Sequence, residues 1–186
     1  MKRLFDFSLA AFAAILLSVL FAMVALAVRL TSSGPILYWS DRVGRYNKIF
    51  RMPKFRTMKI NTPAVATHLL GSPDIYLTPI GGFLRKSSLD ELPQLWNILK
   101  GNMSFVGPRP ALFNQEDLIA LRTQKGVDTL IPGLTGWAQI NGRDELPIPD
   151  KVALDMEYLQ QQSFLLDLKI IFLTFIKVAK RDGISH

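Results

Sequence analysis

Two adjacent carboxylates, Asp90 and Glu91, are the residues of this 186-residue sequence best suited to chemistry at phosphorus. They stand in the stretch SSLDELPQLWNILKGNMSFVGPRP, residues 87–110. A carboxylate is able to attack a phosphoryl group as a nucleophile, and a second one is able to hold a divalent cation. Successive helix positions point about 100° apart, so two neighbouring carboxylates can have different roles. The alternative is that both only complement the dipole of a helix start.

The flanking residues predict a helix that begins near Ser88 and ends at Gly101. Ser88 is a candidate N-cap, and Glu91 follows at the spacing of a capping box. Pro93 removes a backbone donor, which predicts an opened or kinked helix just after the acid pair. Apolar residues recur at helical spacing on one side of this helix. The other side is polar and carries Asp90, Gln94 and Asn97.

An arginine follows the helix in a rigid loop. Arg109 stands between two prolines in the sequence GPRP, residues 107–110. A guanidinium fixed in this way suits bidentate binding of phosphate. Taken alone, such an arginine is equally at home as a surface loop residue.

The composition limits the partners and the chemistry. The chain has 22 Lys and Arg against 15 Asp and Glu, and 49% of its residues are hydrophobic. This balance favours nucleic acid, phosphorylated small molecules or an anionic membrane surface as partners. Without cysteine, disulfides, thiolate metal sites and a cysteine nucleophile are excluded. His68 and His186 show no ligand spacing, so a metal would be bound by oxygen, which favours Mg²⁺ or Mn²⁺.

An uncharged run begins at Phe7 and ends at Val28. As one helix it would be about 33 Å long, enough for the core of a bilayer. We therefore interpret the run as a membrane-inserted segment. A signal peptide is a poor alternative, because the run is long and lacks a small-residue cleavage site. The other alternative is a helix buried in a soluble protein. Basic residues flank both ends, so both flanks favour the cytoplasmic side.

Further elements follow from the local pattern. Residues 36–39 and 48–52 are β-rich and predict a hairpin, and residues 111–125 predict a helix. Residues 132–143 are rich in turn formers. Asp150 is a candidate cap for a helix to about residue 161, and Ser163 for another to about residue 181. That last helix is apolar on one arc and basic on the opposite one, which suits either the interface of an anionic membrane or packing against the core.

Four motifs in this order resemble the bacterial sugar transferase family. They are KRLFD at residues 2–6, the stretch at residues 87–110, PGLTGWAQINGR at residues 132–143 and SFLLDLKIIFLT at residues 163–174. The resemblance covers nearly the whole chain, whose length is similar to that of the minimal family form. It implies a monotopic phosphoglycosyl transferase, which begins glycan assembly on a polyprenyl phosphate.

The fold implied by this resemblance is α+β and mostly helical. Residues 1–30 would form a membrane-inserted, re-entrant helical anchor, and residues 31–186 a catalytic domain with a small β-hairpin and interfacial amphipathic helices. The catalytic domain would lie on the cytoplasmic face of the bacterial inner membrane. In the family a Ser-Pro pair marks the break in the anchor, whereas here Ser18 is followed by Val19. Re-entrant and spanning arrangements therefore both stay open. The family also has a basic residue where this chain has Ile131.

The resemblance further implies the substrates and the roles of the residues. The substrates would be a UDP-sugar and polyprenyl (undecaprenyl) phosphate, with membrane lipids as partners, no nucleic acid, and a homodimer as a candidate assembly. Asp90 would attack the β-phosphate, release UMP and carry a covalent phosphosugar. Glu91 would hold Mg²⁺, with Mn²⁺ as the alternative. The basic residues expected to bind the substrates are Lys54, Arg56, Arg85, Arg109 and Arg143.

Three other classes of protein fit parts of the sequence. A membrane-associated glycosyltransferase would use Asp90 as a general base and release UDP. A metal-dependent lipid diphosphate phosphatase would need no nucleotide sugar. A basic membrane adaptor that binds nucleic acid is disfavoured, because the basic residues form no aromatic-interleaved stripe.

Overall fold

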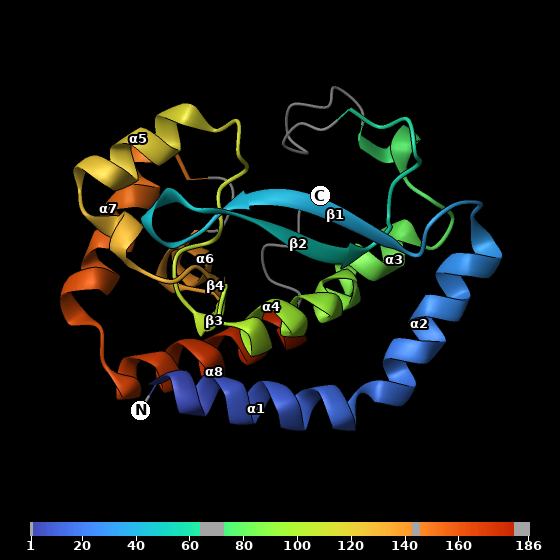
Figure 1. Cartoon of the computed structure of the whole chain (residues 1–186), viewed down its shortest axis with the longest axis horizontal. Coiled ribbons are helices and arrows are strands. Elements are labelled where there is room, and N and C mark those ends of the chain that lie inside the picture. The colour runs from blue at the N-terminus through green and yellow to red at the C-terminus, as the bar shows by residue number, and fades with distance from the viewer. Residues whose placement is uncertain (1, 64–72, 143–145, 181–186) are drawn as a thin grey trace.

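The computed structural model of the chain describes residues 2–63, 73–142 and 146–180. The described part is mostly helical and contains one small antiparallel sheet and one short pair of parallel strands (Figure 1). This confirms the mostly helical α+β prediction. The predicted division at residue 30 into an anchor and a catalytic domain stays a prediction.

The antiparallel sheet is the predicted hairpin. Strand β1 (Leu37–Val43) pairs with β2 (Ile49–Phe55), and both strands are longer than the sequence indicated. The short 3₁₀ helix η1 (Arg45–Asn47) closes the turn. Both strands contain aromatic and β-branched residues, which favour a pleated, half-buried surface.

The chain begins with two helices that meet at a sharp bend. Helix α1 (Lys2–Leu16) and helix α2 (Ser18–Thr31) are bent by 63° around Leu17. Among the described residues, neither helix by itself has the length and apolar character to span a bilayer, whereas the bent pair meets that criterion by length and composition. The bend forms with Val19 in place of a proline.

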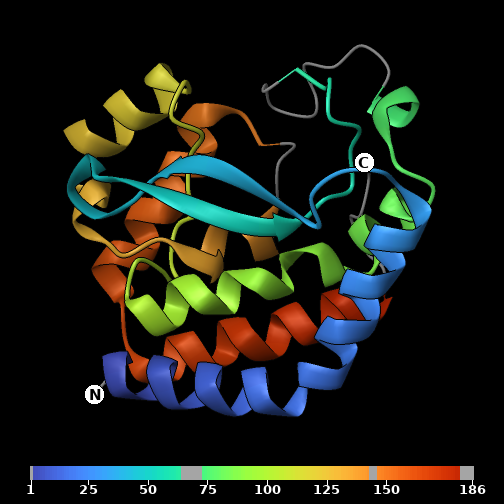
Figure 2. The ribbon, with the colours of Figure 1, turned by 45° about the vertical axis from the view of Figure 1, so that its right-hand side comes forward.

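Polar side chains fasten α1 to the rest of the molecule. Lys2 Nζ lies 2.5 Å from Asp167 Oδ2 and also donates to the hydroxyl of Tyr158. Asp6, which is 4% exposed, accepts a hydrogen bond from the backbone N–H of Phe105. Below the hairpin, Figure 2 shows α4 (Leu95–Lys100), α8 (Phe164–Lys180) and α1, and Ala10 of α1 belongs to the same apolar cluster as Ile98 of α4. The start of the apolar run is therefore part of the packed structure.

The segment that carries the acid pair consists of three short helices. Helix α3 (Gly81–Lys86) is followed by the 3₁₀ helix η4 (Leu89–Gln94) and by α4. Pro93 lies inside the 3₁₀ helix, so the chain is not a regular α-helix just after the acid pair, as predicted. Gly101 ends α4 with φ 88°, which confirms the predicted end of the helix. The predicted capping box is wrong. Ser88 is left-handed with φ 56° and makes no side-chain capping bond, because η4 starts directly from the end of α3.

The second half of the chain differs from the prediction in several bounds. The turn-rich stretch forms strand β4 (Gly133–Thr135), which runs parallel to β3 (Ser104–Val106), and helix α6 (Trp137–Asn141). Short 3₁₀ helices lie at Pro73–Tyr76 (η3) and Val127–Thr129 (η5). Helix α5 (Glu116–Gln124) starts five residues later than expected, because Pro110 and a bridge between Leu112 and Arg42 hold the preceding residues extended.

The last two helices have the predicted extent but only one predicted cap. Helix α7 (Ile148–Gln161) has Pro147 at its N-cap, so the expected cap by Asp150 is wrong. Asp150 lies inside the first turn, where its charge complements the helix dipole. The cap of α8 is confirmed, since Ser163 Oγ accepts a hydrogen bond from the N–H of Leu166.

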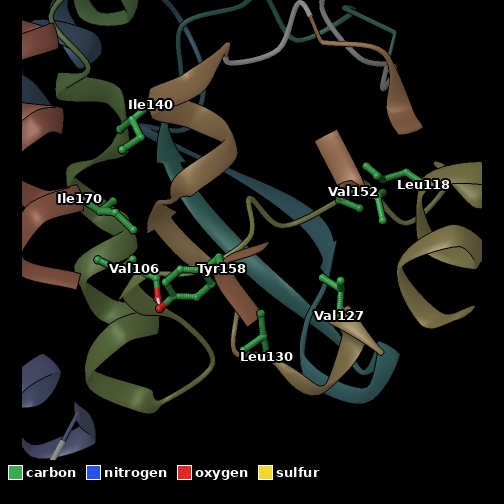
Figure 3. Packing of buried hydrophobic residues seen from close by; sticks show 9 residues of the cluster. Val106, Leu118, Val127, Leu130, Ile140, Val152, Tyr158 and Ile170 are labelled. Atoms are coloured by element: carbon green, nitrogen blue, oxygen red, sulfur yellow. Dashed lines mark hydrogen bonds between the residues drawn. The ribbon is translucent and has the colours of Figure 1, made fainter. Parts of the chain in front are cut away.

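Three apolar clusters hold these elements together. The largest joins α5, α6, α7 and α8 around Tyr158, Ile170 and Val106 (Figure 3). A second places Ala10 of α1 against Met52 of the hairpin, and a third joins α2 and α3. The clusters bury one side of β2 and the inner edges of the N-terminal helices, and the acid-bearing segment packs between them.

Many large apolar side chains stay exposed, and they gather on α1, α2 and α8. The apolar arc of α8 has one buried and one exposed edge. Ile170 is fully buried, whereas Phe172 and Phe175 are 65% and 72% exposed. One edge of α8 therefore packs against the core, while the place of the exposed edge in a membrane interface stays a prediction. The other exposed apolar residues of the three helices are Leu4, Phe7, Phe12, Ile15, Leu16, Val19, Phe21, Met23, Leu26, Leu30, Phe164, Leu165 and Leu168.

Candidate active site

The polar face of the acid-bearing segment points into the protein. Asp90, Gln94 and Asn97 are 7%, 2% and 2% exposed, whereas Trp96 on the apolar side is 51% exposed. The leucines of the apolar side are also partly covered, because they pack against neighbouring apolar clusters. Asn97 Nδ2 donates to the carbonyl oxygen of Arg51 and so fixes the segment against β2. Burial of several polar groups costs free energy, which is typical of a functional site.

Two cations hold the side chain of Glu91. Lys54 Nζ lies 2.7 Å from Glu91 Oε1, and Arg109 Nη2 lies 3.6 Å from the same oxygen. Burial alone would raise the pKa of Glu91, but the positive charges of Lys54, Arg109 and Arg42 outweigh it and lower the pKa to about 2. Glu91 is therefore ionised at neutral pH.

The environment of Asp90 has the opposite effect. Burial raises the pKa of Asp90 to about 6, and the neighbouring charge of Glu91 adds to this, while Lys54, Arg85 and Arg109 oppose it. The ion pairs of Lys54 and Arg109 run to Glu91 and not to Asp90 in the described part of the chain. The two adjacent carboxylates thus differ in their pKa and surroundings. Glu91 is held by ion pairs and is strongly acidic, whereas Asp90 is desolvated and more basic. Such a carboxylate is a good candidate for a nucleophile.

Arg85 interacts with the acid pair, whereas the contacts of Arg56 lie elsewhere. The charges of Arg85 and Asp90 are close enough to affect each other, and Arg85 Nε donates to Thr57 Oγ1. Burial lowers the pKa of Arg85, and the charge of Asp90 opposes this. Arg56 is 5% exposed and donates to the carbonyl oxygens of Pro35 and Ser32 and to Ser32 Oγ. These contacts fasten the connection between α2 and β1, so they favour a structural role for Arg56.

A buried ion pair positions the loop that carries Arg109. Arg122 donates to Asp155 Oδ2 through Nε at 2.9 Å and Nη2 at 2.7 Å, and through Nη1 to the carbonyl oxygen of Arg109 at 2.8 Å. Both side chains of the pair are nearly inaccessible to solvent. The hydrogen bonds connect α5 and α7 with the backbone next to the acid pair. Neither residue was a candidate from the sequence, because no local motif marks them.

Close backbone contact between two distant motifs supports the same loop. The N–H of Gly133 donates to the carbonyl oxygen of Pro108, and the N–H of Gly107 donates to that of Thr135. A Cβ on Gly133 would lie 2.1 Å from the backbone nitrogen of Gly107. Only glycine permits this approach, so the PGLTG motif forms the support of the GPRP loop.

Arg42 is a site residue that the sequence did not single out. Its Nη1 donates to the carbonyl oxygen of Pro110, and it contributes to the acidity of Glu91. In the hairpin register Tyr38 pairs with Lys54 and Arg42 with Phe50, so Arg42 and Lys54 share one face of the sheet. The alternation was present in the sequence, but the register that aligns the strands was not. Arg143, His68 and His186 lie outside the described residues.

The acid pair offers oxygen ligands for a divalent cation. Among the described residues there is no group of three or more acidic or histidine side chains that could form a protein cage for a metal. Mg²⁺ commonly uses one or two carboxylates together with the phosphates of a substrate. The ionised Glu91 beside Asp90 fits that arrangement.

The site thus consists of one basic, buried carboxylate, one fixed carboxylate and several cations, all next to a large exposed apolar surface. It defines an enzyme that acts on phosphorylated compounds. The model of the bacterial sugar transferase family matches residues 1–181, and the chain belongs to this family.

Three curated relatives illustrate the similarity. The uncharacterized sugar transferase EpsL of Bacillus subtilis is 43% identical, and the match covers 100% of this chain and 91% of that protein. The undecaprenyl-phosphate glucose phosphotransferase of Komagataeibacter xylinus is 40% identical over 93% of this chain, and the UDP-glucose:undecaprenyl-phosphate glucose-1-phosphate transferase of Escherichia coli is 40% identical over 95%. The chain spans only 35% and 40% of the length of these last two.

Proposed function

We propose that this chain transfers a sugar phosphate from a UDP-sugar to a membrane polyprenyl phosphate and releases UMP. The observation that carries the proposal is the contrast between Asp90 and Glu91. One relative is named as an undecaprenyl-phosphate glucose phosphotransferase and another as a UDP-glucose:undecaprenyl-phosphate glucose-1-phosphate transferase, which supports the same type of reaction for this chain.

The reaction would take place in two displacements at one phosphorus atom. An oxygen of the Asp90 carboxylate attacks the β-phosphorus of the UDP-sugar, a bond from oxygen to phosphorus forms, and the anhydride bond to UMP breaks. An oxygen of the polyprenyl phosphate then attacks the same phosphorus and displaces the Asp90 carboxylate. The product is a polyprenyl diphosphate–sugar. The raised pKa supports Asp90 in this role, because a more basic carboxylate is a stronger nucleophile.

The cations near the acid pair would stabilise charge on the phosphoryl oxygens. The charge of Arg85 acts on Asp90, and Lys54 and Arg109 contact Glu91, so all three would be close to the diphosphate of the donor. Arg143 is proposed for the nucleotide sugar on the resemblance alone. Arg56 is a weaker candidate as a ligand, because its donors are taken by Ser32 and Pro35.

A divalent cation, Mg²⁺ or Mn²⁺, would be held by Glu91 and would neutralise charge on the diphosphate. The chain itself keeps Glu91 ionised through Lys54, Arg109 and Arg42. This fixed charge is what makes Glu91, and not Asp90, the proposed ligand.

The exposed apolar surface would place the site at the membrane. Helices α1 and α2 would enter one leaflet and return at the 63° bend, with α8 lying in the interface. The acceptor lipid and the soluble donor would then meet at the acid pair on the cytoplasmic face.

The decisive experiment uses the full chain in nanodiscs with undecaprenyl phosphate, Mg²⁺ and a panel of UDP-sugars. Release of UMP supports the proposal, whereas release of UDP would indicate a glycosyltransferase. Incubation with the donor alone should add a phosphosugar to the peptide that holds Asp90, as read by mass spectrometry. Asp90→Asn should abolish turnover, and full activity of that variant would refute the assignment. Hydrolysis of a lipid diphosphate without nucleotide would favour the phosphatase alternative.

A further inference from the structure

Gln94 carries a buried amide that has no hydrogen-bond partner. Its side chain is 2% exposed, and within the described residues its Nε2 meets no acceptor. A buried N–H donor without a partner costs free energy, so such a group in a well-packed protein needs an explanation. Either an ordered water or a ligand completes the hydrogen bonding of this amide.

The amide lines a cavity directly beside the acid pair. The cavity is narrow, with about 10 Å³ of space for a water-sized group. Its polar lining consists of Gln94, Arg42, Arg109 and Glu91, and Met52 and Leu134 close its apolar side. This space admits one oxygen-sized group, such as a water or a single oxygen of a larger ligand. That oxygen must accept hydrogen bonds from an amide and two guanidinium groups.

The charges of the lining select the class of occupant. Two guanidinium groups, of Arg42 and Arg109, and one carboxylate, of Glu91, line the cavity. A guanidinium offers donors in a planar fork that matches a phosphoryl group, and an amide N–H₂ adds a donor without adding charge. A cation is disfavoured by the two arginines, and an apolar group would leave the amide of Gln94 without a partner.

We propose that Gln94 and Arg42, together with Arg109, form a binding site for a phosphoryl oxyanion of a substrate next to Glu91. Gln94 Nε2 donates to one phosphoryl oxygen, and the two guanidinium groups bind its charge. The identity of the phosphate, from the UDP-sugar or from the polyprenyl phosphate, rests on the proposed function. The site itself rests on the cavity and the buried amide.

The test compares three variants of the full chain in nanodiscs. Gln94→Met keeps the size and removes the donor, and Gln94→Glu places a negative charge in the cavity. Gln139→Met is the matched control, because Gln139 also has a buried amide without a partner among the described residues but does not line the cavity. The measurements are binding of UDP, the KM for each substrate, and the thermal unfolding midpoint without substrate.

We expect Gln94→Met to weaken substrate binding about ten- to hundredfold, which corresponds to a lost hydrogen bond to a charged group. Gln94→Glu should weaken it further, and the unfolding midpoint of Gln94→Met should be unchanged or higher, since an unsatisfied donor is removed. A loss confined to UDP binding and donor KM assigns the site to the donor phosphate. A loss confined to the KM of undecaprenyl phosphate assigns it to the acceptor.

Unchanged binding and KM in Gln94→Met would overturn the inference and leave a buried water as the partner of the amide. An equal loss in Gln139→Met would overturn it as well. Failure of the proposed function is distinguishable from both results, because it would appear as absence of UMP release by the unaltered protein.

Discussion

Arg122 and Asp155, which lie 33 positions apart in the sequence, form a buried ion pair whose guanidinium also holds the carbonyl oxygen of Arg109. The pair is thus both a link between α5 and α7 and a support for the loop that faces Glu91. Because it joins stability to the geometry of the site, its removal should affect both.

Asp155→Asn should lower the free energy of unfolding by about 3–5 kcal/mol, since the Arg122 charge stays buried without its counter-ion. The same variant should reduce turnover of the protein that remains folded, because the Arg109 loop loses its support. Thermal unfolding and UMP release measure the two effects. Gln161→Ala is the control, as its 3.4 Å contact with Glu157 is exposed, and it should change stability by less than about 0.5 kcal/mol. A small loss in Asp155→Asn, equal to that of the control, would contradict this reading.

The raised pKa of Asp90 predicts a pH-dependent cost to stability. The pKa rises from 3.8 to about 6 on folding, so between these pH values the folded protein keeps a proton that the unfolded chain has released. Stability of the wild type should therefore fall, relative to Asp90→Asn, as pH rises through this window, by about 3 kcal/mol at most. Unfolding midpoints of both proteins in EDTA, measured from about pH 3.5 to about pH 7.5, test this prediction. A difference that stays constant with pH would show that Asp90 is not desolvated.

The contact between the GPRP loop and PGLTG predicts an intolerant glycine. Gly133→Ala would bring a Cβ to 2.1 Å from the backbone nitrogen of Gly107, and neither backbone can move without breaking the β3–β4 pairing. We expect a loss of stability of about 2 kcal/mol or more together with loss of turnover. Gly82→Ala is the control, because its Cβ would meet only Leu77 Cδ1 at 3.7 Å. Wild-type behaviour of Gly133→Ala would show that the two motifs lie farther apart.

The exposed edge of α8 predicts a specific loss of membrane binding. Replacement of Phe172 and Phe175 by Ser removes two exposed rings, each worth about 1.5–3 kcal/mol when buried in an apolar phase. Binding to anionic vesicles should weaken at least about tenfold, while the unfolding midpoint changes little. Ile49→Ser in the hairpin is the control, since Ile49 is equally apolar and 56% exposed but lies on another part of the surface. An equal loss of vesicle binding in both variants would show that α8 has no specific part in membrane binding.

The bend at Leu17 predicts that a proline is tolerated beside it. Val19 lies in the first turn of α2, where the helix does not require a backbone donor. Val19→Pro should therefore keep activity and membrane association close to those of the wild type. Leu26→Pro, in the middle of α2, should abolish both, because an interior proline breaks the helix. Inactivation by Val19→Pro as complete as by Leu26→Pro would mean that the pair straightens into one helix in the membrane.

The sequence by itself determined those features that depend on near neighbours. The hairpin followed from β-rich runs around a turn, the end of α4 from Gly101, and the irregular geometry after the acid pair from Pro93. The carboxylates themselves were evident from their types and their place at a helix start. Each of these signals is written within one or two turns of chain, where local sterics and hydrogen bonding decide the backbone.

Only the tertiary structure decided how the two carboxylates differ. Lys54 reaches Glu91 across 37 positions, and this contact, with the burial of Asp90, sets their pKa values apart. In the same way Arg56, a candidate ligand from its motif, is directed to the connection after α2. Such partners depend on strand register and on the packing of distant helices. No local periodicity records them, because charge and burial act through space rather than along the chain.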